Sequence, residues 1–171
     1  DLEAFRLGEE PAALREAYGN NKLGQGCLLA RRLLEKGIRY VEVASGGWDM
    51  HNNIDDGLQE KGAELDVALS ALLNDLKERG MLETTLVVLC GPKINGNGGR
   101  DHHPKVFSTL LAGGGVKGGF IYGSSDKAGD SVADKQVSVQ DFLSTVGWGI
   151  GLPVDEVVMS PSNRPFTVGD K

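Results

Sequence analysis

The chain has few of the features that mark disulfide-rich, membrane or secreted-precursor proteins. It has only two cysteines in 171 residues, too few for a disulfide framework. Its apolar runs fall well short of the roughly 20 residues that cross a bilayer, so no membrane span is predicted. The first residues do not show the basic and then apolar pattern of a signal peptide. These absences favour an ordinary globular protein.

Positive charge is also scarce. Lysine and arginine number 18 against 24 acidic residues, which gives a formal net charge of −6. A nucleic-acid surface needs clustered cations to displace counterions, so no nucleic-acid partner is expected.

With 40% hydrophobic residues, the chain suits a single α/β domain over residues 1–171. Cys27, on an apolar helical face, and Cys90, at the end of an apolar strand, are expected to be small core residues.

Hydrophobic periodicity predicts alternating helices and strands. Helices are expected over residues 10–19, 22–36 and 57–79, and from a capping box of Ser138 and Asp141. Strands are expected over residues 38–44, 84–90 and 106–112, with a short one at 120–122. The order of strand, long helix and strand predicts a βαβ unit with parallel strands, whose carboxyl ends share one edge.

All three histidines fall in the two segments predicted to lie at that edge. One segment holds Asp49 and His51, and the other holds Arg100, His102 and His103. Side chains at i and i+2 of an extended loop point to the same side, so Asp49 and His51 can share one ion. Carboxylate oxygen and imidazole nitrogen suit zinc, whereas calcium, manganese or magnesium would want more oxygen ligands. The sequence therefore predicts a divalent-metal site, with zinc favoured.

Each of these residues also has a plainer interpretation. Asp49 can cap the loop or the coming helix, and His51 can be a solvated loop residue. His103 is either a further ligand or turned away from the ion. Arg100 either binds an anionic substrate, because its planar fork suits sulfate or phosphate, or forms an ion pair with Asp101.

Several segments, in the right order, resemble the DUF1501 family over nearly the whole chain. They are KLGQGCLLARRL at 22–33, GGWDMH at 46–51, GRDHHP at 99–104, LAGGGVKGG at 111–119 and SPSNRPF at 160–166. The second of these is similar to a family Gly-Gly-Trp-Asp-Thr-His loop, with Met50 in place of Thr. The chain thus resembles the carboxy-terminal half of a sulfatase-like protein of the alkaline phosphatase superfamily.

The resemblance implies an alkaline-phosphatase-like fold with a mostly parallel sheet flanked by helices, of which this chain is the carboxy-terminal portion. It implies a metal-dependent hydrolase of small anionic esters or sulfated glycans, with Asp49, His51 and His102 at metal positions. It also implies export or a periplasmic location. The superfamily nucleophile belongs to the amino-terminal half, so this chain alone is expected to be inactive. The alternative is a non-catalytic exported metal- or ligand-binding protein of the same fold.

The chain departs from the family after the second strand. Family members have Gly-Glu-Phe-Gly-Arg-Thr-Pro-Lys there, whereas this chain has Cys90-Gly91-Pro92-Lys93. The lost Glu and Arg argue against a second metal. The missing stretch is either a true deletion or an omission from the sequence as printed. We favour omission, which predicts that Gly91 and Pro92 are not joined by a peptide bond.

Overall fold

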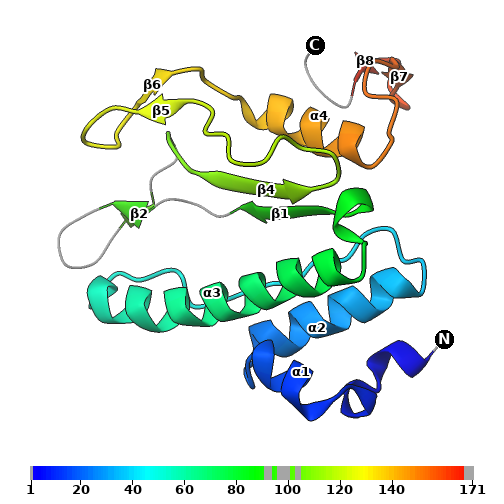
Figure 1. Cartoon of the computed structure of the whole chain (residues 1–171). Helices are drawn as coiled ribbons and strands as arrows, with labels where there is room; N and C mark the ends of the chain where they lie inside the picture. The colour runs from blue at the N-terminus through cyan, green and yellow to red at the C-terminus, as the bar shows by residue number, and fades with distance from the viewer. Residues whose placement is uncertain (1, 91–93, 96–100, 103–104, 168–171) are drawn as a thin grey trace. The chain divides into compact units, whose positions relative to one another are not determined.

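The structure is a computed structural model that describes residues 2–90, 94–95, 101–102 and 105–167, the two short pieces by their backbone alone (Figure 1). The chain divides into two compact units. The amino-terminal unit comprises residues 1–82 and 94–102, and the carboxy-terminal unit comprises residues 83–93 and 103–171. Within the described residues, no helix combines the length and the apolar composition that a membrane span requires.

Helices and short strands make up both units. The helices are α1 (Ala12–Ala17), α2 (Lys22–Glu35), α3 (Ile54–Glu78) and α4 (Val139–Gly149), with 3-10 turns η1 (Leu2–Phe5), η2 (Leu7–Glu9) and η3 (Leu82–Thr84). The strands are β1 (Leu86–Cys90), β2 (Ile94–Asn95), β3 (Asp101–His102), β4 (Thr109–Gly113), β5 (Ser124–Ser125), β6 (Val132–Asp134), β7 (Val158–Met159) and β8 (Pro165–Phe166). The described strands form four two-stranded antiparallel sheets, β1–β4, β2–β3, β5–β6 and β7–β8.

The four expected helices form, and local capping explains two of their starts. The Oδ1 atom of Asn21 accepts the backbone N–H of Gly24 at 2.8 Å, which satisfies a free donor at the start of α2. α3 begins at Ile54, slightly before the predicted start. α4 has the predicted reciprocal capping box between Ser138 and Asp141.

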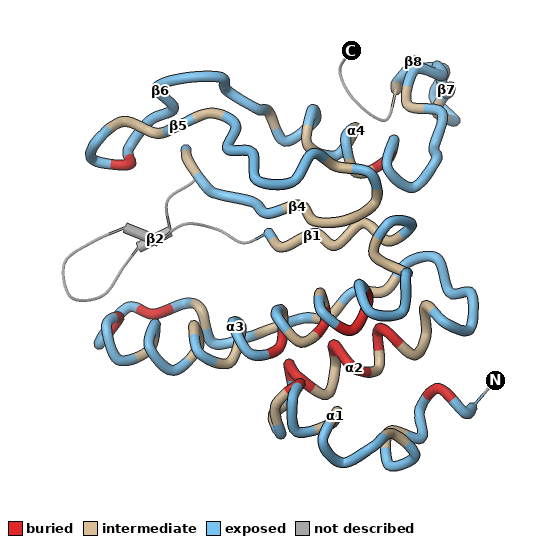
Figure 2. Tube along the Cα trace, in the orientation of Figure 1, coloured by how far each residue is buried: buried red, intermediate tan, exposed pale blue. Residues whose placement is uncertain are grey.

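The core of the amino-terminal unit lies between α2 and α3, where the buried residues gather in Figure 2. Its apolar side chains include Leu23, Cys27, Leu28 and Ala30 of α2 and Ala68, Leu72 and Leu76 of α3. Cys27 is thus a core residue as expected, and burial raises the pKa of its thiol to about 11. That shift keeps the thiol neutral at physiological pH.

Apolar burial is much weaker in the carboxy-terminal unit. Ile121 is 90% exposed and Trp148 is 69% exposed. Cys90, expected in the core, is exposed. It is the last residue of β1, opposite Thr109, and the only exposed position of that strand. An apolar run therefore predicted the strand correctly but not the burial of its final residue.

The predicted alkaline-phosphatase-like parallel sheet is wrong. Every described strand pair is antiparallel, and the longest pair joins β1 to β4, with Leu86 opposite Gly113. β4 forms close to the strand expected at 106–112. A parallel pair needs a crossover of a dozen or more residues, usually a helix. No helix lies among the described residues between β1 and β4, which agrees with an antiparallel pair.

The strand expected at 38–44 is also absent from the described structure, which removes the first member of the predicted βαβ unit. From Val41 onward burial in this segment still alternates, with Val41 and Val43 half-buried and Glu42 exposed. Val43 packs against α2, because a Cβ atom placed on Gly26 would lie 2.9 Å from Val43 Cγ1. Strand propensity is realised through neighbouring strands, and this segment packs on a helix instead.

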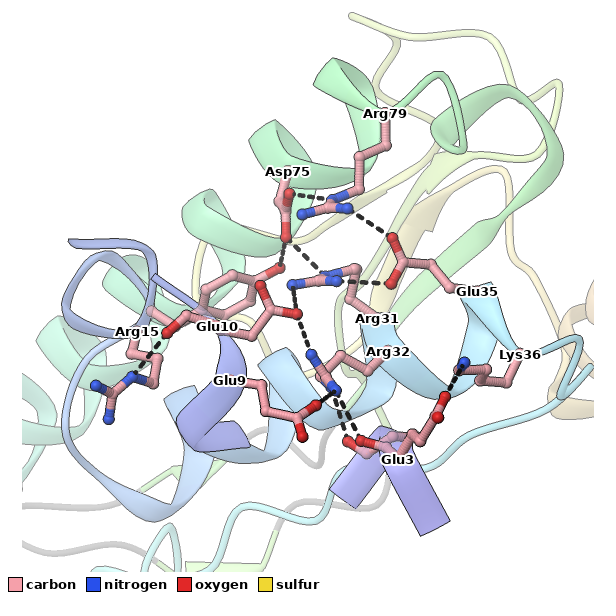
Figure 3. A network of polar contacts seen from close by, with 12 residues as sticks. Glu3, Glu9, Glu10, Arg15, Arg31, Arg32, Glu35, Lys36, Asp75 and Arg79 are labelled. Atoms are coloured by element: carbon pink, nitrogen blue, oxygen red, sulfur yellow. Dashed lines mark hydrogen bonds and ion pairs between the residues drawn. The ribbon is translucent and has the colours of Figure 1, made fainter. Parts of the chain in front are cut away.

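A polar network centred on Arg31 joins the first residues of the chain to α2 and α3 (Figure 3). The Arg31 side chain is 1% exposed. Its Nε lies 2.9 Å from Asp75 Oδ2, its Nη2 2.9 Å from Glu10 Oε1, and its Nη1 2.7 Å from Glu35 Oε2. The first two contacts are ion pairs without hydrogen-bond alignment. Three carboxylates from three parts of the unit therefore compensate one buried guanidinium.

Asp75 is the most heavily bonded of these carboxylates. Its Oδ1 accepts from Arg79 Nε at 2.6 Å, and its Oδ2 accepts from the Tyr18 hydroxyl at 2.8 Å. Burial alone would raise the pKa of Asp75. The hydrogen bonds from Arg79 and Tyr18 and the charge of Arg31 outweigh burial and hold that pKa below its usual value. The carboxylate is therefore charged in the folded protein.

Replacing Asp75 by alanine should destabilise the protein strongly, because it leaves the Arg31 charge buried with one partner fewer. We expect Asp75→Ala to lower the free energy of unfolding by about 3–5 kcal/mol at pH 7. The effect should shrink below about pH 4, because a lowered folded-state pKa stabilises only above the unfolded pKa and is lost as pH falls through the folded one. Urea unfolding at several pH values measures both quantities.

Asp66→Ala is the matched control, since Asp66 is exposed on the same helix. It should stay within about 0.5 kcal/mol of wild type at every pH. Equal losses for the two variants, or an Asp75→Ala effect that does not change with pH, would contradict this account of the network.

Candidate metal centre

In the loop of residues 45–53, burial alternates from Gly47 to His51. Trp48 is half-buried and Met50 is buried, whereas Asp49 and His51 are exposed. Just upstream, over residues 41–45, Val41, Val43 and Ser45 are the more buried residues. The more buried residues are therefore odd-numbered before residues 46–47 and even-numbered after them. This change leaves Asp49 and His51, both odd-numbered, facing solvent.

Gly47 makes the phase change possible. Its φ of +85° lies in the left-handed region that favours glycine. A Cβ atom on Gly47 would also lie 3.1 Å from Lys61 Cε, so the loop passes close to α3 at this point. At the other end, Asn53 adopts a left-handed φ of +51° just before α3 begins. Two residues of unusual backbone conformation thus bracket the loop.

The two predicted ligands in this loop meet in the structure. His51 Nδ1 lies 3.2 Å from Asp49 Oδ1, and the two side chains are 49% and 61% exposed, respectively. A histidine that donates from Nδ1 to a carboxylate keeps the lone pair of Nε2 for a metal ion, and the carboxylate fixes the ring orientation. The pair can therefore act either as two ligands of one ion or as one ligand with its orienting partner.

The remaining predicted site residues lie in the less completely described part of the chain. His102 is placed only by its backbone, in β3, opposite Ile94 of β2 and within the amino-terminal unit. Arg100, His103 and the Gly91–Pro92 junction lie outside the described residues. Among the side chains that are described, no group of three or more His, Cys, Asp and Glu residues converges on one point. The three-ligand site thus stays a prediction.

Two neighbours of the loop were not anticipated from the sequence. Lys61 lies beside Gly47, with its Nζ 2.9 Å from Glu64 Oε2, and Gly57 lies against Met50. Their separation of four residues places Gly57 and Lys61 on one face of α3. The hydrogen bond to Glu64 raises the pKa of Lys61, which is therefore a cation beside the loop. A glycine four residues before a lysine, just after a Gly-Gly-Trp-Asp loop, is the signal that could have revealed them.

The described chain is an α and β protein that presents an exposed carboxylate–imidazole pair on a loop of its amino-terminal unit. A family model for a protein of unknown function, DUF1501, matches residues 1–171. The chain belongs to the DUF1501 family. Neither the curated proteins nor the solved structures contain a match to it.

Gly47→Ala tests whether the left-handed glycine holds the loop. A side chain at this φ costs about 1–2 kcal/mol, so the free energy of unfolding should fall by about that amount. The end of the flexible Lys61 side chain, 3.1 Å from the added Cβ, can move aside. Gly46→Ala is the control, because nothing lies within 4 Å of a Cβ atom there. It should leave stability unchanged or slightly raised. Equal losses in urea unfolding would show that the conformation of Gly47 is not the constraint.

Proposed function

We propose that this chain is the metal-holding module of a hydrolase that acts on anionic esters, sulfate esters first and phosphate esters second. The observation that carries the proposal is the contact between Asp49 and His51, side by side at 3.2 Å and turned to solvent. His102 is the proposed third ligand, and His103 is the candidate for a further one. The sulfatase-like character of the family resemblance supports the reaction class.

The donor set fits a divalent ion of the zinc type. One carboxylate and two imidazoles with an open fourth position are the donor types and number typical of a catalytic zinc site. Calcium, manganese and magnesium are the alternatives if carbonyl or water oxygens complete the shell. An ion held there would supply Lewis acidity toward an ester oxygen or a nucleophile. Asp49 and His51 would hold that ion, and Asp49 would also orient the His51 ring.

Arg100 is the proposed anion-binding residue, because a guanidinium fork matches the oxygen geometry of sulfate and phosphate. A small sulfated or phosphorylated ester, or a sulfated glycan, is the proposed substrate class. Export is part of the same proposal and comes from the family resemblance. The nucleophile would be supplied by the amino-terminal half of the family's fold.

A non-catalytic metal- or ligand-binding role is the second candidate, and the exposure of the pair favours it. Hydrolases commonly close their sites to water, which strengthens electrostatic interactions inside them. Asp49 and His51 are each about half exposed or more. A binding protein can hold an ion at such an open position without turning over a substrate. Metal affinity is common to both candidates, and turnover separates them.

Titration with zinc tests the metal site directly. Wild type should bind zinc in a calorimetric titration, and Asp49→Asn, His51→Ala and His102→Ala should each weaken binding by more than about tenfold, because even partners outside the ligand shell contribute about 10–100-fold. Asp66→Asn removes the same kind of charge from an exposed position on α3 and should bind zinc like wild type. Absence of zinc binding by wild type, or retention by all three variants, would reject the site.

Hydrolysis assays separate the module from a complete enzyme. The chain by itself should show no sulfatase or phosphatase rate above background with nitrophenyl esters and zinc, because the proposed nucleophile lies elsewhere. A rate that this chain supports alone, and that disappears in His51→Ala, would contradict the assignment of the nucleophile to another part of the fold. Zinc binding without any turnover, even with the amino-terminal half supplied, would favour the binding protein.

A further inference from the structure

Met50 is the buried residue between the two proposed ligands. Its side chain is only 9% exposed, whereas its neighbours on both sides face solvent. Because successive side chains alternate, an inward Met50 turns Asp49 and His51 outward together. The Met50 N–H donates to the Trp48 carbonyl at 3.0 Å, which closes a tight turn centred on Asp49. The orientation of Asp49 and His51 therefore depends on what the Met50 thioether packs against.

The Met50 thioether packs against Gly57, in the first turn of α3. A Cβ atom on Gly57 would lie 2.6 Å from Met50 Sδ, closer than packed atoms approach, and 3.2 Å from its Cε. The thioether thus occupies the volume that the missing side chain leaves free. A flexible, unbranched methionine is suited to filling such an irregular gap. Glycine is unfavourable within a helix relative to alanine, so its presence here is consistent with a packing requirement.

We propose that Met50 and Gly57 are positioning residues, and that their packing sets the affinity of the Asp49–His51 pair for a divalent ion. This inference rests on the proposed function. Between the left-handed residues Gly47 and Asn53, Met50 is the buried side chain of the loop. It therefore fixes the middle of the loop while the backbone conformations fix its ends. Neither residue touches the ion, and both act through the direction in which the ligands point.

A glycine-to-alanine change separates this role from ordinary stability. Alanine at position 57 removes no atom and improves helix propensity, so the helix itself should not be weakened. Its Cβ would overlap the Met50 thioether, which must move. We expect Asp49 and His51 to change direction when Met50 moves. The prediction is therefore a loss of metal affinity without a matching loss of helical structure. A purely structural role for Gly57 would not produce that combination.

The experiment compares Gly57→Ala with Gly62→Ala, a change in the same helix where nothing lies within 4 Å of the added Cβ atom. In calorimetric zinc titrations, Gly57→Ala should bind about tenfold or more weakly than wild type. Gly62→Ala should bind zinc within about twofold of wild type, because the added Cβ atom contacts nothing. Circular dichroism and urea unfolding would confirm that both variants are folded. In the metal-free protein, the Met50 methyl resonance should shift in Gly57→Ala and not in Gly62→Ala.

Two substitutions at Met50 complete the test. Met50→Leu conserves most of the buried volume and should keep zinc affinity near that of wild type, whereas Met50→Ala should lose it. Because Met50→Ala also opens a cavity, Gly57→Ala is the decisive variant. Equal zinc affinity of wild type and Gly57→Ala would overturn this inference alone. Failure of wild type to bind zinc would overturn the proposed function and this inference with it.

Discussion

Burying a guanidinium costs several kcal/mol unless nearby carboxylates replace the lost water, and the amino-terminal unit is built around one such group. Arg31 of α2 meets Asp75 of α3, Glu10 before α1 and Glu35 at the end of its own helix. Arg32 extends the network to Glu10 and to the carbonyls of Glu3 and Ala4. These contacts require the first residues, α2 and α3 to come together in one arrangement, and the apolar core between α2 and α3 fills the space that results.

The same helix that completes this network also carries the candidate metal loop. Asp75 and Arg79 lie near the end of α3, whereas Gly57 and Lys61 lie near its start. At a rise of 1.5 Å per residue, Gly57 and Asp75 are roughly 27 Å apart along the axis. Contacts at that separation do not overlap, so changes at the two ends should have additive effects on stability. The Arg31 network can therefore hold α3 in place independently of substitutions in the loop of residues 45–53.

Local patterns predicted the helices well because their causes are local. The i, i+3, i+4 rhythm of α2 and α3 and the Ser138–Asp141 capping box are contained within single segments. The sheet could not be predicted in the same way, because strand pairing depends on residues distant in sequence. Residues 38–44 have strand composition but pack on α2 through Val43, and β1 pairs with the later β4. The error lay in the assumed partner of β1, not in its existence.

The candidate site shows the same division at the scale of one loop. The spacing of Asp49 and His51 was enough to predict that their side chains lie on one side, because period-two alternation is a property of the backbone. It did not say which side. Continuing the odd-numbered burial of Val41, Val43 and Ser45 would have turned both residues inward, away from any ligand. The left-handed turn at Gly47 reverses that phase, and the Met50 thioether against Gly57 holds it reversed. The outward orientation of Asp49 and His51 thus depends on Gly57 of α3, because a glycine there leaves room for the Met50 thioether.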